Sequence, residues 1–255
     1  MKLGIIGFGR LGALLTRYLA QDFHTVVYEP RPEAQEAISA CGATAVDFAT
    51  AAGQDLVLPL VPISQFEEVL QKMVPHLKQG AIVADCCSVK VKPVAAMEQH
   101  LPEHVSILAT HPMFGPDSAG DTLFGSKLVI CPVRIAPERY QSLKVYLEKH
   151  GIKLIESTPE EHDEQISRSL FLAHFIGRGL LEIEASPLEI DTKGYRRLMK
   201  ILLTVENDSW QLFEDMYQHN PYAENTRAEF VNAMQTLSDR IRPQEKNTSH
   251  ESHKS

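Results

Sequence analysis

The sequence lacks several features that mark whole classes of protein. It has four cysteines in 255 residues, too few and too scattered for a disulfide framework, and the adjacent pair Cys86-Cys87 does not have the spacing of metal ligands. No apolar run approaches the ~18 residues of a membrane span, and glycines interrupt the apolar start, unlike a signal peptide. We therefore expect reduced thiols in a cytoplasmic protein, with no bound metal and no membrane contact.

Positive charge is also scarce. Lysine and arginine number 25 against 33 aspartates and glutamates, which gives a formal net charge of −8. Because the acidic residues are spread along the chain, nucleic acid and anionic membranes are disfavoured as partners. The expected partner is a small molecule.

Short β-rich runs alternate with helical patterns over the first part of the chain. The runs cover residues 2–6, 24–29, 43–46, 55–62, 81–87, 105–112, 127–133 and 152–157. This alternation predicts an α/β domain over residues 1–157, with a doubly wound parallel sheet covered by helices on both faces. Residues 158–242 have a helical pattern and predict a smaller all-helical domain, and the polar residues 243–255 predict a disordered tail.

A glycine-rich turn, "GFGRLG", lies between the first predicted strand and the first predicted helix. In that context Gly7 suits a tight turn, Gly9 allows close approach of a pyrophosphate, and Gly12 allows close helix–strand packing. The pattern predicts a dinucleotide-binding fold of the Rossmann type, with the phosphates at the helix N-terminus. The expected cofactor-binding residues of the turn are Gly7, Phe8, Gly9, Arg10, Leu11 and Gly12.

The second predicted strand ends at Glu29, seventeen residues after Gly12. A carboxylate there would accept hydrogen bonds from the adenosine ribose and repel a 2′-phosphate, which favours NAD over NADP. NADP stays an alternative cofactor, because the guanidinium of Arg31 would pair with that phosphate.

Three polar residues follow strands at the predicted ligand edge. His111 follows "VSILAT", and Ser88 and Lys90 follow the run 81–87. Ligands of open α/β sheets bind where parallel strands end, so His111 is a candidate proton acceptor, held by the prolines of "THPMFGP". From position alone it is equally well a structural loop residue, and Ser88 equally well a helix cap.

Six motifs together resemble the TyrA family of prephenate and arogenate dehydrogenases, with the greatest similarity to the plant-type arogenate enzymes. They are "GFGRLG" (7–12), "DCCSVK" (85–90), "THPMFGPDS" (110–118), "EHD" (161–163), "LFLAHFIGR" (170–178) and "SPLEIDTKGY" (186–195). The resemblance implies that His111 accepts the proton of the ring hydroxyl while hydride leaves for NAD(P). It also implies that Ser88 hydrogen-bonds the ring hydroxyl and His111. Substrate contacts are implied for His174 and Thr192, with Lys90 a further candidate at the ligand edge.

The resemblance also bears on the substrate and the assembly. Asp208, in "ENDSWQLF", aligns where an acidic residue accompanies arogenate and an asparagine accompanies prephenate. A one-residue shift in the alignment would put the adjacent Asn207 at this position and reverse the inference. We therefore expect arogenate as the substrate, with prephenate, or the use of both substrates, as the alternative. Leu203 stands where many bacterial prephenate enzymes have arginine, and Leu170 where plant-type enzymes have glutamine. A homodimer through the helical domain is implied.

Two other classes fit the glycine turn. A β-hydroxyacid or imine dehydrogenase would share the domain plan, but such enzymes usually centre on a lysine in the helical domain, where this chain has His174. The second class is a non-enzymatic NAD-sensing module. Loss of turnover with retained NAD binding in a His111→Asn variant would separate an enzyme from such a module.

Overall fold

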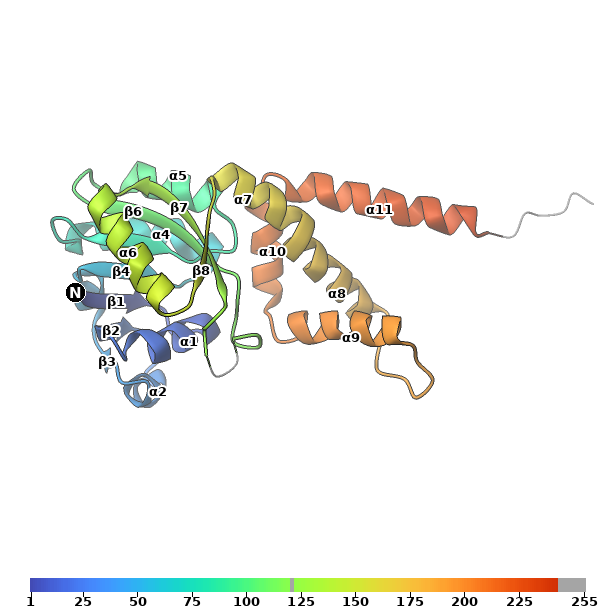
Figure 1. Ribbon diagram of the computed structural model, residues 1–255, viewed down its shortest axis with the longest axis horizontal. Coiled ribbons are helices and arrows are strands. Elements are labelled where there is room, and N and C mark those ends of the chain that lie inside the picture. Colours follow the sequence, from blue (N-terminus) through green and yellow to red (C-terminus); the bar gives the residue numbers. More distant parts are fainter. Residues whose placement is uncertain (120–121, 243–255) are drawn as a thin grey trace, which may run out of the picture.

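The computed structural model of the chain describes residues 1–119 and 122–242. Figure 1 shows a sheet wrapped by helices, followed by a group of helices that extends to one side. The predicted tail, residues 243–255, lies outside the described residues. None of the helices in the described ranges has both the length and the apolar character needed to cross a membrane.

A single eight-stranded sheet forms the centre of the first part. Its spatial order is β3-β2-β1-β4-β5-β6-β7-β8. The strands are β1 (Lys2–Ile6), β2 (His24–Tyr28), β3 (Thr44–Ala45), β4 (Leu56–Pro59), β5 (Ile82–Asp85), β6 (Ser106–Pro112), β7 (Lys127–Arg134) and β8 (Lys153–Glu156). The order reverses between β1 and β4, which is where ligands of doubly wound sheets bind. The predicted fold class is confirmed.

The prediction of a wholly parallel sheet is wrong at one edge. β7 pairs antiparallel with β6, and β8 runs parallel to β7, so the last two strands oppose the other six. A parallel pair needs a long crossover, normally helical. The described residues between β6 and β7 contain no helix, and the chain returns beside the strand it has just left.

Helices cover both faces of the sheet and enclose two apolar clusters. On one face lie α1 (Arg10–Leu19), α2 (Ala34–Ala40) and α6 (Pro137–Lys149), around buried side chains that include Leu3, Ile5 and Ile38. The other face packs against α3 (Phe48–Ala52), α4 (Ile63–Met73), a short 3₁₀ turn (Val74–His76) and α5 (Val91–His100). Successive strand side chains alternate between these two clusters.

The rest of the described chain is helical, as predicted. It contains α7 (Pro159–Ile166), a π-helical turn (Ser167–Phe171), α8 (Leu172–Glu182), α9 (Lys193–Val205), α10 (Trp210–Gln218) and α11 (Ala223–Arg240). A capping box between Thr158 and Glu161 starts α7. Gly177 lets α8 and α9 meet closely, because an added Cβ would lie 2.6 Å from a Val205 methyl. A domain boundary at residue 157 stays a prediction.

Candidate active site

The glycine turn has the steric form that a bound pyrophosphate requires. Gly7 has a φ of +103°, and a Cβ there would lie 2.3 Å from the Leu60 carbonyl oxygen. A Cβ at Gly12 would lie 2.4 Å from the Gly7 oxygen, whereas one at Gly9 would meet no atom within 4 Å. No side chain of the described residues caps α1 at Gly9. The open space and free first-turn amides fit the phosphates of a dinucleotide.

Glu29, the residue after β2, contacts the same turn. Its carboxylate accepts hydrogen bonds from the Phe8 amide (2.8 Å) and from Nε of Arg31 (2.8 Å), and its side chain is 7% exposed. Burial raises the pKa of Glu29, but these hydrogen bonds outweigh it and hold the pKa below its usual value. Glu29 and Arg31, predicted to read the ribose end, are therefore ion-paired with each other beside the turn.

His111 lies within β6, so the prediction of a loop mount needs correction. The residue pairs with Val129 of β7, and sheet hydrogen bonds fix its backbone. Its side chain is buried, and its Nδ1 lies 2.9 Å from Nε2 of His162 in α7. Burial first, then the neighbouring His162 and Lys90, holds the pKa of His111 well below its usual value. The imidazole is thus neutral near pH 7 and able to accept a proton.

The partner of His111 is itself held by a carboxylate. Nδ1 of His162 lies 2.7 Å from Oδ1 of Asp163. Asp163 also accepts the backbone amides of Lys90 (2.6 Å) and Val91 (2.9 Å) at the start of α5. The predicted helix-cap role of Ser88 is therefore wrong, because Asp163 from another helix takes these amides. Among the described residues Ser88 makes no hydrogen bond, and the implied bond to His111 is not formed.

Lys90 is a structural residue, which corrects its expected substrate contact. Its side chain is 0% exposed, and its ammonium bonds to the equally buried Asp85 carboxylate and to the Thr110 carbonyl oxygen (2.6 Å). Burial alone would lower the pKa of Lys90, but Asp85 raises it above its usual value. With its donors turned into the core, Lys90 has no route to a ligand.

His174 and Asp208, both predicted substrate-binding residues, lie beside each other. Nε2 of His174 is 3.6 Å from Oδ2 of Asp208, whose Oδ1 receives a hydrogen bond from Arg10 (3.2 Å). Arg10 also pairs with Asp117 at 2.7 Å. Burial, then the charge of Arg178, lowers the pKa of His174 to about 4. Burial also raises the pKa of Asp208, against the opposing charge of Arg10. One expected cofactor residue and two expected substrate residues thus share one cluster.

Thr192 is not brought to this cluster. Its hydroxyl accepts the Tyr195 amide (3.2 Å) and caps α9, at the end of the α8–α9 pair remote from the sheet (Figure 1). Thr192 therefore lies apart from the other predicted substrate-binding residues, and its substrate contact stays a prediction. A cap is the ordinary role of a threonine before a helix.

Sequence reasoning missed the roles of four acidic or imidazole residues around the site: Asp85, Asp117, His162 and Asp163. A signal was present for two of them, since "EHD" places a histidine beside an aspartate at a helix start. Asp85 and Asp117 had no such signal, because their partners are five and more than one hundred residues away.

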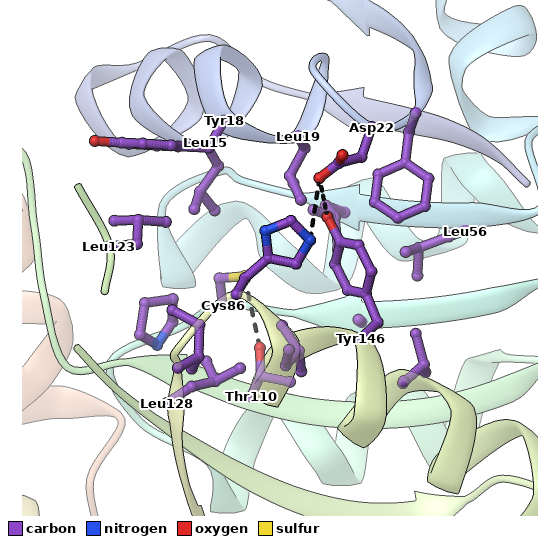
Figure 2. Close-up of a pocket in the computed structure, with 18 of the residues that line it drawn as sticks. Leu15, Tyr18, Leu19, Asp22, Leu56, Cys86, Thr110, Leu123, Leu128 and Tyr146 are labelled. Atoms are coloured by element: carbon purple, nitrogen blue, oxygen red, sulfur yellow. Dashed lines mark hydrogen bonds and ion pairs between the residues drawn. The ribbon is translucent and has the colours of Figure 1, made fainter. Parts of the chain in front are cut away.

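A cavity of about 460 Å³ lies between α1 and α6 (Figure 2). Leucine is the most frequent residue of its lining, and at one end Asp22 accepts a hydrogen bond from the Tyr146 hydroxyl (2.8 Å). Thr110 faces this cavity, so His111, the next residue of the strand, points to the opposite face. The cavity is therefore separate from the histidine cluster.

Known proteins resemble this chain in sequence and in fold. The family model of the prephenate dehydrogenase nucleotide-binding domain matches residues 13–156, and that of the TYRAAT1-like C-terminal domain matches residues 180–253. Arogenate dehydrogenase 2, chloroplastic, of Arabidopsis thaliana is 32% identical over 234 residues, which cover 88% of this chain and 65% of that protein. The chain thus spans somewhat less than two thirds of this relative's length.

Two solved structures share the fold. Prephenate dehydrogenase from A. aeolicus, in complex with hydroxyphenyl propionate and NAD+, superposes with a TM-score of 0.76 at 22% identity, covering 94% of this chain and 91% of that one. Synechocystis arogenate dehydrogenase gives a TM-score of 0.68 at 22% identity, covering 94% and 93%. With the nucleotide-binding model matching more than half of its residues, the chain belongs to the prephenate dehydrogenase family.

Proposed function

We propose that the protein catalyses the NAD(P)-dependent oxidative decarboxylation of arogenate to tyrosine, with prephenate as the alternative substrate. One observation carries the proposal: a buried imidazole, His111, lies at the carboxyl edge of the sheet in a chain of the prephenate dehydrogenase family. A proton acceptor with a lowered pKa at the ligand edge suits the oxidation of a hydroxyl group near neutral pH.

The reaction balances with one proton acceptor. His111 takes the proton of the ring hydroxyl as hydride leaves the same carbon; a bound nicotinamide supplies the hydride acceptor. The ring carboxylate then departs as CO2, and its bonding electrons complete the aromatic ring as a phenolate. His111 returns the proton to the phenolate oxygen. The side chains therefore have to orient the ring and hold one proton, which is work for positioned groups.

The preference for arogenate rests on Asp208. A carboxylate attracts the ammonium of arogenate and has no favourable partner in the ketone of prephenate. Asp208 faces His174 at 3.6 Å, in the helical region. Its pairing with Arg10 competes with such an ammonium, so we expect cofactor phosphates that engage Arg10 to free Asp208.

Steady-state kcat/KM with both substrates tests this preference. We expect arogenate to be favoured, and Asp208→Asn to reduce kcat/KM for arogenate about tenfold more than for prephenate, since one charge-assisted contact is lost. Asp117→Asn is the matched control, because it removes the other carboxylate on Arg10. A tenfold preference of the wild type for prephenate would overturn the assignment to arogenate.

The catalytic role of His111 has its own test. His111→Asn is expected to abolish most turnover while cofactor binding, followed by fluorescence titration, is retained. Unchanged turnover would remove His111 as the proton acceptor. Retained cofactor binding with no wild-type turnover of either substrate would instead favour a non-enzymatic NAD-binding protein.

The cofactor, the assembly and the location are further proposals. NAD is favoured by the charged Glu29, and NAD+ is the cofactor in the A. aeolicus structure; the ratio of KM values for NAD and NADP tests this. A homodimer is supported by exposed apolar side chains on the last helices, among them Trp210, Met234 and Leu237. A monomeric mass in light scattering would contradict it. Four free thiols support a reducing compartment, for which we propose the cytoplasm.

A further inference from the structure

One ring nitrogen of His111 has a specific partner. Nδ1 of His111 lies 2.9 Å from Nε2 of His162, and Nδ1 of His162 lies 2.7 Å from Asp163. All three side chains are at most 5% exposed. Asp163, His162 and His111 therefore form a buried chain of hydrogen bonds that leaves one ring nitrogen, Nε2 of His111, outside it.

The Asp163 carboxylate, at the end of this series of hydrogen bonds, determines the direction in which they donate. An ionised aspartate only accepts hydrogen bonds, so Nδ1 of His162 must carry a proton. In a neutral His162 the other nitrogen, Nε2, then has the lone pair and accepts from Nδ1–H of His111. The remaining nitrogen of His111 is consequently unprotonated, which is the state a proton acceptor needs.

Both charged groups beside the histidine pair are engaged by other partners as well. The charged groups near the pair are Lys90, which is buried and paired with Asp85, and Asp163 itself. The charge of Asp163 is already engaged by two backbone amides at the N-terminus of α5, where the helix dipole favours an anion.

We propose that His162 and Asp163 are positioning residues that fix the tautomer of His111, so that its Nε2 is the proton acceptor. This inference rests on the proposed function for its catalytic meaning. The same carboxylate holds the start of α5, directly after Ser88. Asp163 thus positions both the histidine and the loop that presents Ser88.

Asp163→Asn is the decisive variant. With its oxygen on the Val91 amide, the asparagine places its NH2 group where Oδ1 was, so the Lys90 amide loses its acceptor. That NH2 group donates to His162, which reverses the hydrogen-bond chain and places a proton on Nε2 of His111. The equivalent exchange in a Ser-His-Asp triad lowers turnover on the order of 10⁴-fold through the wrong tautomer, so we expect a loss of at least about 100-fold. Glu164→Gln, an exposed carboxylate one residue later, is the matched control with turnover unchanged.

Two readouts separate this role from a purely structural one. Nitrogen-15 shifts of the His111 ring, identified by their absence in His111→Asn, should show a protonated Nδ1 and a bare Nε2 in the wild type, and the reverse in Asp163→Asn. The pH profile should also change. Wild-type kcat/KM should be flat above the low pKa of His111, whereas the variant should rise with pH, because hydroxide must first remove the misplaced proton.

A pair of substitutions at His162 adds a rescue test. The oxygen of His162→Gln replaces Nε2 as the acceptor, whereas His162→Leu leaves Nδ1–H of His111 unpaired and buried. We expect His162→Leu to lose about 10- to 100-fold in turnover and His162→Gln to recover most of it. Equal losses with unchanged thermal unfolding would overturn the positioning role.

The result that would overturn the proposal outright is a protonated Nε2 of His111 in the wild type, as a charged His162 would produce. An unaltered tautomer and pH profile in Asp163→Asn would do the same. The nitrogen shifts need no substrate, so an enzyme that turns over neither arogenate nor prephenate would contradict the proposed function while leaving the tautomer measurable.

Discussion

Replacing Lys90 with methionine tests the corrected role of this residue. The substitution keeps an unbranched side chain that is one atom shorter and removes its charge. In the wild type the ammonium contacts the Asp85 carboxylate and the Thr110 carbonyl oxygen, with both charged side chains 0% exposed. In Lys90→Met, Asp85 stays buried with no counter-ion.

The size of the effect follows from what Asp85 retains. Removing one partner of a buried ion pair costs about 3–5 kcal/mol. Asp85 still accepts the amides of Cys87 (3.0 Å) and Thr110 (3.1 Å), so we expect a value near the lower limit, about 3 kcal/mol. For a chain of this size, that corresponds to a fall in Tm of roughly 6–12 °C.

Urea unfolding at pH 7 measures the loss as a shift of the midpoint at constant slope. Asp85 keeps the pKa of Lys90 above its usual value, against the opposing effect of burial. The contribution of the ammonium to stability is therefore fully present below about pH 10 and is lost as the pH rises beyond it. A neutral assay pH thus records its full effect.

A matched lysine provides the control. Lys72 pairs with Glu68 one helical turn away, but the two side chains are 61% and 67% exposed. Solvent screens such a pair, so Lys72→Met should unfold at the same urea concentration as the wild type. An unchanged midpoint for Lys90→Met, together with a raised KM for the substrate, would refute the buried pair and restore Lys90 as a ligand contact.

Three other perturbations have outcomes set by single side chains. Burial and a neighbouring arginine lower the pKa of His174 from 6.5 to about 4, so folding stability should fall by up to about 3 kcal/mol as the pH falls from 6.5 to 4. In urea unfolding, His174→Gln should not show this loss, and an equal loss in both proteins would contradict the lowered pKa. Arg10→Met removes the cation at the start of α1 and should weaken cofactor binding about tenfold in fluorescence titration; an unchanged Kd would exclude a phosphate contact. Cys41 and Cys86 are both partly exposed, but desolvation raises the pKa of Cys86 to about 12. Native labelling with iodoacetamide at pH 8 should therefore modify Cys41 faster than Cys86 in peptide mass spectra, and the opposite order would contradict the raised pKa.

The glycine turn could be predicted from the sequence because its determinants are local. The positive φ of Gly7 and the contact of Gly12 with the Gly7 oxygen both arise within one turn of chain. The position of His111 at the carboxyl edge is similarly local, since it needs only the end of a strand. These are the parts of the site for which neighbouring residues specify the backbone.

The parts that could not be predicted depend on which element packs against which. Lys90 lies at the ligand edge by sequence, but the start of α5 turns its side chain under the sheet toward Asp85. His162 reaches His111 across 51 residues, because α7 packs on α5. Thr192 shares a motif with its neighbours yet caps a remote helix. Residue order does not encode these orientations, whereas burial and helix packing do.

Carboxylates of the helical region determine which helix N-terminus at the sheet edge is open to an anion. Asp163 accepts the first amides of α5, and Asp215 accepts the amide and hydroxyl of Ser64 in the first turn of α4. Both positive helix ends are thereby occupied by negative side chains. At α1 the corresponding carboxylate, Asp208, bonds to the Arg10 side chain instead of the backbone. The α1 amides beside Gly9 stay available, which is the arrangement that the proposed anionic cofactor would need, while Asp163 also positions His162 beside His111.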